Sequence, residues 1–232
     1  MTDDASSAAS PEPAATAPAT DTAAADFSTS RLEAFSDGVF AIAITLLVLD
    51  LHVPEPDTLH GQSLGAALGH QWPSYFAYLV SFLVIGIIWI NHHAMCALAR
   101  RVDRRTLFAN LFLLLTVSVI PFPTRLLATY LTARNSDAHT AAAIYAATMV
   151  AMGIAFSLLF LAFTRDARTL NTPIPPEALR AALRRFSIGG LCYLATVGIA
   201  YLSPVAMLAT HALLAVYYCF DQLAPARVTR AG

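Results

Sequence analysis

The sequence predicts an all-α membrane protein with six transmembrane helices per subunit. Of its 232 residues, 57% are hydrophobic and only 12% carry a charge, against about 25% charged residues in typical globular domains. The hydrophobic residues form continuous runs of bilayer-spanning length, about 20 residues each, whereas the strands of a membrane β-barrel alternate polar and apolar residues. The formal net charge of −1 provides no basic field for nucleic acid, so no nucleic-acid partner is expected.

The apolar runs begin after Arg31 and follow one another with short polar connections. The second run opens at Trp72, an aromatic residue typical of the headgroup region. Pro121 interrupts the third run and predicts a kink there. Pro204 cannot continue the preceding helix, so the last two runs should form a tight hairpin. The expected spans are 35–53, 73–95, about 106–131, about 140–163, about 186–202 and 205–220.

The chain divides into two tails and one membrane domain. Residues 1–30 consist mainly of Ala, Ser, Thr, Pro and Asp, without Arg, Lys or a continuous apolar run. This composition predicts a disordered cytoplasmic N-terminal tail and not a signal peptide. The transmembrane domain is expected over residues 31–221, and residues 222–232 should form a cytoplasmic C-terminal tail.

Arginine is distributed unevenly between the two sides of the predicted spans. Positive charge near the ends of membrane helices is retained in the cytoplasm. Only Arg125 and Arg134 lie on the side opposite both termini, which leaves twelve of the 14 basic residues on the side of the termini. The sequence therefore predicts a multi-pass protein of the plasma membrane with both termini in the cytoplasm.

The first span carries polar side chains at its inner end. Arg31 begins the segment, and Ser36 and Asp37 follow one to two turns later. An ionisable group at such a depth is costly and is a functional candidate by default, normally with a partner. These side chains therefore either serve the function directly or belong to a buried hydrogen-bond network that holds the helices together.

A stripe of residues follows one face of the first span. The spacing alternates between four and three residues, which places the members of the stripe above one another on the helix. The stripe either faces an axis shared by several copies of the helix or packs inside a single bundle. Asp37 lies about 100° away from Gly38, so it would point toward neighbouring helices and not down such an axis. The members are Arg31, Phe35, Gly38, Ile42, Thr45 and Leu49.

Two segments resemble a known family. The first begins at Arg31 and reads Arg-Leu-Glu-Ala-Phe-Ser-Asp-Gly-Val-Phe-Ala-Ile-Ala-Ile-Thr-Leu-Leu-Val-Leu, which is similar to the signature first helix of the transmembrane protein 175 family of potassium channels. The second, Trp-Ile-Asn-His-His from Trp89, resembles the same family. The resemblance covers about residues 31–221. It implies a homotetramer in the lipid bilayer whose first helices line a central pore for potassium ions, with no cofactor.

The resemblance also implies roles for particular residues. The family's hydrophobic constriction falls on Ile42, and Leu46 and Leu49 extend the apolar lining outward. The threonine linked to cation selectivity falls on Thr45, and selectivity should be moderate because mobile hydroxyl groups form no rigid cage. The motif that ties the pore helix to its neighbours is matched by Arg31, Phe35, Ser36 and Asp37, with Asn91, His92 and His93 as candidate partners.

Other functions remain as alternatives. The principal one is a proton-coupled transporter of small solutes or ions that uses Asp37 with His92 or His93 as a proton relay. Adjacent histidines in a helix point about 100° apart, so they cannot hold one metal ion together, and no metal site is expected. No phosphate loop or nucleophile motif is present, so the chain is not expected to be an enzyme. Asp50 and the following loop acids form either a cation-concentrating vestibule or ordinary solvated charges.

Overall fold

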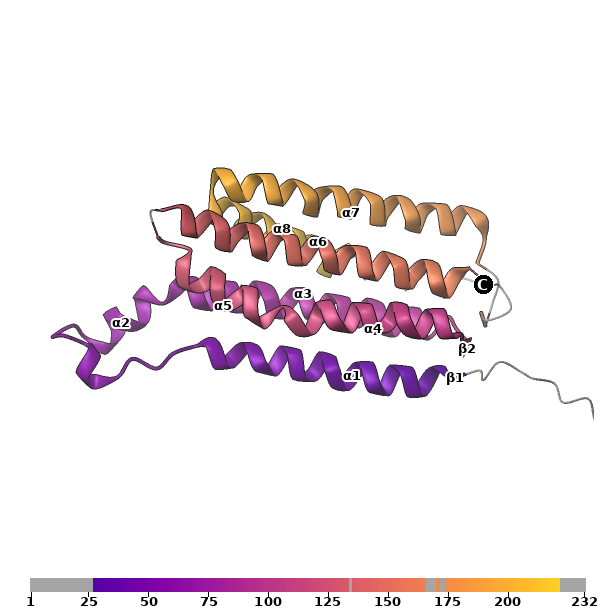
Figure 1. The fold of residues 1–232 in the computed structure, drawn as a ribbon, viewed down its shortest axis with the longest axis horizontal. Coiled ribbons are helices and arrows are strands. Elements are labelled where there is room, and N and C mark those ends of the chain that lie inside the picture. The colour runs from indigo at the N-terminus through magenta and orange to yellow at the C-terminus, as the bar shows by residue number, and fades with distance from the viewer. Residues whose placement is uncertain (1–26, 134, 166–169, 172–173, 222–232) are drawn as a thin grey trace, which may run out of the picture.

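A computed structural model describes residues 27–133, 135–165, 170–171 and 174–221, which form an elongated bundle of helices running side by side (Figure 1). The architecture is mostly helical, as the apolar runs predict. Helices labelled η are short 3-10 helices. The elements in chain order are β1 (Phe27–Ser28), α1 (Thr29–Leu46), η1 (Leu47–Asp50), η2 (Pro56–Thr58), α2 (Leu64–His70), α3 (Trp72–Cys96), β2 (Arg101–Val102), α4 (Arg104–Val119), α5 (Pro121–Tyr130), α6 (Ser136–Thr164), α7 (Pro176–Leu202) and α8 (Pro204–Asp221).

Five helical segments of the described residues are long and apolar enough to cross a membrane. They are Thr29–Asp50, Trp72–Cys96, Arg104–Tyr130, Ser136–Thr164 and Pro176–Leu202. α8 is a further apolar helix, and its 18 residues extend about 27 Å at 1.5 Å per residue. This length is close to the hydrocarbon thickness of a bilayer, about 30 Å. The protein therefore has five or six candidate membrane helices.

The two proline signals in the sequence are confirmed. α4 ends at Val119 and α5 begins at Pro121, so the predicted kink divides the third span. The last two helices are separated by Ser203 alone, because α8 begins at Pro204. The tight hairpin is therefore present.

The first and fifth spans differ most from their expected bounds. The first was expected over residues 35–53, but α1 begins at Thr29 and its 3-10 extension η1 ends at Asp50. The fifth was expected from residue 186, but α7 begins at Pro176, a residue type favoured in the first helical turn. Both helices start in polar sequence before the apolar run, because backbone hydrogen bonding does not stop at the edge of the hydrocarbon region.

The connections and tails also differ in part from the prediction. Residues 27–30, which were expected in the N-terminal tail, form β1 and the start of α1. The remainder of the two predicted tails, 1–26 and 222–232, lies outside the described residues. The short helix α2 between α1 and α3 has no counterpart in the prediction.

α1 lies at one edge of the bundle. It packs on α3 and α4, whereas α7 lies at the opposite edge and packs on α6 and α8 (Figure 1). α6 occupies the centre, where it contacts α4, α5, α7 and α8 and buries Tyr145, Met149 and Met152 completely. The core therefore lies around α6, and α1 is supported from one side only.

Loop segments tie helices together at the end of the bundle that carries β1 and β2, which we call the β1 end (Figure 1). β1 and β2 pair in antiparallel orientation. The hydroxyl of Thr29 donates a hydrogen bond to Ala99 O at 3.2 Å. The backbone N–H of Asn171 donates to Leu98 O at 2.8 Å. The start of α1 is thus fixed to the α3–α4 connection, which is joined in turn to the α6–α7 connection.

Candidate functional site

α1 has a buried face and an exposed face. Its buried residues point into the bundle, and the stripe that the spacing predicts lies entirely on the opposite, exposed face. The stripe therefore does not pack inside this bundle. The buried residues of α1 and η1 are Leu32, Ser36, Phe40, Ala43 and Leu47.

The exposed face is apolar over the half of α1 that lies away from the β1 end. Ile42 is 60% exposed, Leu46 42% and Leu49 72%, and a continuous apolar strip of this kind contacts either lipid or another protein surface. Thr45 lies among them, and its hydroxyl donates to Ala41 O and Ile42 O, both at 2.9 Å. Because the hydroxyl hydrogen points back to the helix backbone, the oxygen lone pairs remain on the exposed face.

The carboxylate of Asp37 finds its partner on α3. Asp37 Oδ1 accepts a hydrogen bond from the indole Nε1 of Trp89 at 2.8 Å. Within the described part of the chain, neither His92 nor His93 hydrogen-bonds to Asp37. Asp37 therefore bonds to Trp89 and not directly to either histidine.

A directional chain of hydrogen bonds joins α3, α4 and α1. Ser36 Oγ donates to Leu32 O at 2.8 Å and accepts from Asn110 Nδ2 at 2.9 Å. Asn110 Oδ1 lies 2.8 Å from His92 Nε2, and because an amide oxygen only accepts, His92 Nε2 carries the proton. The other nitrogen of this ring, Nδ1, lies 3.7 Å from Cys96 Sγ and can accept the thiol hydrogen. Each group thus has a defined role as donor or acceptor.

A third polar contact lies nearer the β1 end. Glu33 Oε1 of α1 lies 2.5 Å from His93 Nδ1 of α3. The His93 side chain is 64% exposed, so this pair is more solvated than the chain that begins at Ser36. Together, the contacts of Glu33, Ser36 and Asp37 fasten consecutive turns of α1 to α3 and α4, and they fix the rotation of α1 about its axis.

Three predicted network residues lie elsewhere. Asn91 does not face α1 but lines a cavity between α3, α6, α7 and α8, because it lies about 100° from His92 around α3. Phe35 is 58% exposed. Arg31 is exposed, and it has no hydrogen bond or ion pair with another described residue.

Two site residues were not predicted as partners. Asn110 lies in an otherwise apolar span, where a polar side chain is costly without a partner, and this signal could have identified it. Trp89 belongs to the second family-like segment, and an indole N–H in apolar surroundings needs an acceptor. Neither signal says which helix supplies the partner.

The far end of α1 is held by an ion pair. Asp50 Oδ1 in η1 lies 3.8 Å from Arg125 Nε in α5. The Asp50 side chain is only 16% exposed, whereas that of Arg125 is 64% exposed. Asp50 therefore has a charged partner within the protomer.

The two histidines of the site each contact a side chain of another helix. His92 is engaged with Asn110, and His93 is paired with Glu33. Across the residues that the structure describes, no group of three or more His, Cys, Asp or Glu side chains is placed to hold a metal ion.

Comparisons with known proteins agree on one family. A family model described as the endosomal/lysosomal potassium channel TMEM175 matches residues 31–121. A potassium channel of Streptomyces collinus is 51% identical over 193 residues, which cover 83% of this chain and 92% of the relative. A potassium channel of Chamaesiphon minutus is 37% identical over 190 residues, covering 82% and 93% of the two chains. The crystal structure of a lysosomal potassium-selective channel TMEM175 homolog from Chamaesiphon minutus superposes with a TM-score of 0.75 at 36% identity, over 83% of this chain and 97% of that one.

Replacing Asn110 tests the hydrogen-bond chain. Asn110→Leu should lower the free energy of unfolding by about 1–3 kcal/mol, because it leaves the buried His92 Nε2–H without an acceptor. The measurement is unfolding of the purified protein in mixed micelles of detergent and SDS. The control is Ser118→Ala, which removes an exposed hydroxyl bonded only to Leu115 O of the same helix. Equal stability of the two variants would contradict the assigned role of Asn110.

Proposed function

Because this chain belongs to the TMEM175 family of cation channels, we propose that it forms a homotetrameric channel, moderately selective for potassium, whose pore is lined by four copies of α1. The relatives from Streptomyces and Chamaesiphon are named potassium channels. The solved structure is described as that of a homolog of a lysosomal potassium-selective channel, TMEM175. These names support potassium as the permeating ion.

The observation that carries the proposal is the exposed stripe of α1. The helix lies at the edge of the protomer, and its polar contacts aim Ile42, Thr45 and Leu49 away from the bundle. In a closed ring of identical subunits, the same surface of every copy faces the symmetry axis. Four copies of the stripe then surround an axis with apolar rings and one ring of hydroxyl groups.

The apolar rings would act as a gate. Ile42, Leu46 and Leu49 offer no oxygen that could replace the hydration shell of an ion. A constriction of such side chains that is narrower than a hydrated ion expels water and blocks flow. Opening requires the helices to turn or splay far enough for water to accompany the ion.

The hydroxyl ring would supply selectivity. The hydrogen of the Thr45 hydroxyl is directed toward the helix backbone, so its oxygen can face a cation on the axis. Potassium holds its hydration shell less tightly than sodium and should lose less on exchanging water for these oxygens. The ring is built from side chains and not from a fixed set of backbone carbonyls, so the preference should be moderate.

The orientation of the channel follows from its arginines. Arg100, Arg101 and Arg104 lie at the β1 end, as does Arg31. Positive charge is retained on the cytoplasmic side, so the β1 end would face the cytoplasm, with both termini there, in the plasma membrane. Arg168, Arg227 and Arg230, which the sequence places on the same side, lie outside the described residues.

Truncation of Ile42 tests the gate. Passive potassium flux into liposomes that contain purified protein should rise about tenfold in Ile42→Ala, which corresponds to a barrier lower by about 1.4 kcal/mol. The matched control is Ile154→Ala, because Ile154 has a similar exposure of 53% but lies on α6. The control should conduct like the wild type.

The same flux assay can also contradict the channel proposal. If no variant passes potassium passively, the channel proposal fails. Transport that appears only with an imposed proton gradient and disappears in Asp37→Asn would support the transporter alternative instead.

Replacing Thr45 tests the selectivity ring. Thr45→Val keeps the shape of the side chain but removes its oxygen, so the permeability ratio of potassium to sodium should fall toward one while current persists. Single-channel reversal potentials under bi-ionic conditions measure this ratio. Thr129→Val on α5 is the control, since the Thr129 hydroxyl also donates to a backbone carbonyl of its own helix, Arg125 O. An unchanged ratio in Thr45→Val would contradict the assigned role.

A further inference from the structure

A cavity of about 290 Å³ lies between α3, α6, α7 and α8. α7 and α8 lie on the side of the bundle away from α1, whereas α3 also packs on α1 (Figure 1). In the proposed tetramer the side of the cavity formed by α7 and α8 would face the lipid. Ala94, Arg185 and Gly190 line the cavity and are exposed. The cavity therefore reaches the outer surface of the protomer.

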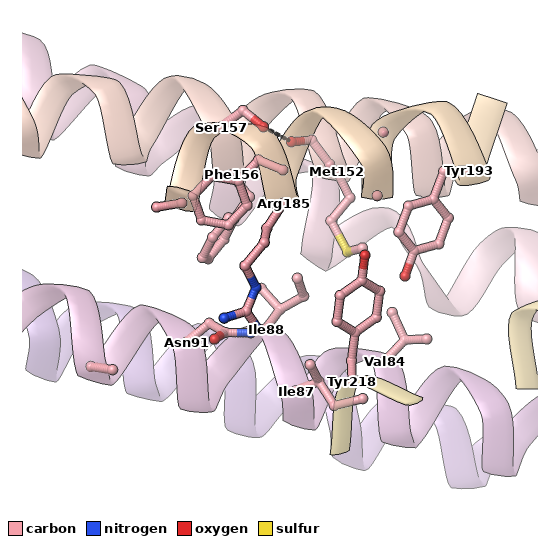
Figure 2. A pocket seen from close by; sticks show the side chains of 16 residues that line it. Val84, Ile87, Ile88, Asn91, Met152, Phe156, Ser157, Arg185, Tyr193 and Tyr218 are labelled. Atoms are coloured by element: carbon pink, nitrogen blue, oxygen red, sulfur yellow. Dashed lines mark hydrogen bonds between the residues drawn. The ribbon is translucent and has the colours of Figure 1, made fainter. Parts of the chain in front are cut away.

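The two ends of the cavity carry different polar groups. Figure 2 shows Arg185 extending from α7 toward Asn91 on α3, with Ser157 and Phe156 of α6 at the same end. The Ser157 hydroxyl donates to Gly153 O at 2.8 Å. The other end lies among Met152, Val84, Tyr193 and Tyr218 (Figure 2).

Glycine residues keep this space open. A Cβ atom at Gly153 or Gly190 would meet no other atom within 4 Å, so both glycines face empty space. Gly189 differs from them, because a Cβ atom there would collide with the hydroxyl of Tyr218. The volume of the cavity therefore depends on missing side chains at Gly153 and Gly190.

The Arg185 end of the cavity lies near the proposed cytoplasmic surface. Asn91 precedes the end of α3 at Cys96 by about 8 Å at 1.5 Å per residue. Arg185 lies where α7 changes from a polar segment with Arg180 and Arg184 to an apolar one. A basic group at this depth, with an apolar cavity extending deeper, matches the boundary between lipid headgroups and acyl chains.

We propose that this cavity binds an anionic phospholipid of the cytoplasmic leaflet. The phosphate of the lipid contacts the guanidinium of Arg185 and the amide of Asn91, and the first carbons of an acyl chain enter between Met152 and Val84. Guanidinium groups bind phosphate oxygens in a bidentate manner, and basic pockets between membrane helices on the cytoplasmic side bind anionic headgroups. The volume, 290 Å³, is at the lower end of the range for ligand sites, about 300 to 1,000 Å³, so most of the lipid stays in the bilayer. The inference rests on the proposed orientation but not on ion conduction.

Native mass spectrometry of the purified protein tests the proposal. Phosphatidylglycerol and phosphatidylcholine with identical acyl chains are added in turn, and retention of phosphatidylglycerol by the wild type should be about fivefold higher, the effect of one arginine near a membrane surface. Arg185→Gln should abolish this preference. Gly153→Leu should also abolish it, since it fills the cavity while keeping every arginine. Arg184→Gln, which removes the same charge from an exposed residue that does not line the cavity, should keep it.

Three outcomes would overturn the proposal. Equal retention of the two lipids by the wild type would remove the charge preference. A preference that survives in Gly153→Leu would place the lipid on surface arginines and not in the cavity. Displacement of the lipid by soluble glycerol 3-phosphate at equal concentration would assign the site to a free phosphate compound. The assay needs no ion flux, so its failure is distinguishable from failure of the channel proposal.

Discussion

The hydrogen bonds that fasten one face of α1 are the constraint on which the rest of the account depends. Ser36, Asn110 and His92 are buried and bond to one another in a fixed direction, and Trp89 holds Asp37 beside them. Breaking such contacts in apolar surroundings leaves polar groups unsatisfied, at a cost of about 1–3 kcal/mol each. The rotation of α1 is therefore fixed, and its opposite face, with Ile42 and Thr45, must point out of the protomer.

The same constraint suggests how a gate in α1 would move. The side-chain hydrogen bonds to neighbouring helices lie in one half of the helix, from Glu33 to Asp37, and the far end carries only the longer contact of Asp50 with the exposed Arg125. The half that carries Ile42 and Leu46 is held by apolar packing of Phe40, Ala43 and Leu47, which is not directional. We expect opening to splay this half while the β1 end keeps its hydrogen bonds, because sliding apolar contacts costs less than breaking buried polar ones.

Local sequence features predict much of the fold, but they do not predict which residues of neighbouring helices contact α1. Proline rules predict the break at Pro121 and the turn before Pro204, because proline acts on its own helix. The spacing of Ser36 and Asp37 likewise shows that they need partners. Helical periodicity says nothing, however, about which residue a neighbouring helix presents, so Asn110 was not predicted, and Asn91 was placed in the network although it faces the other side of α3.

The accessibility of a cysteine at position 42 shows whether α1 lines a pore. The protein would carry Cys192→Ser and Cys219→Ser, while Cys96 can stay because it is buried. If α1 lines the pore, a cationic thiol reagent blocks potassium flux through Ile42→Cys in liposomes and leaves Ile154→Cys unaffected. Flux through Ile42→Cys that persists after complete modification of the cysteine would contradict a pore lined by α1.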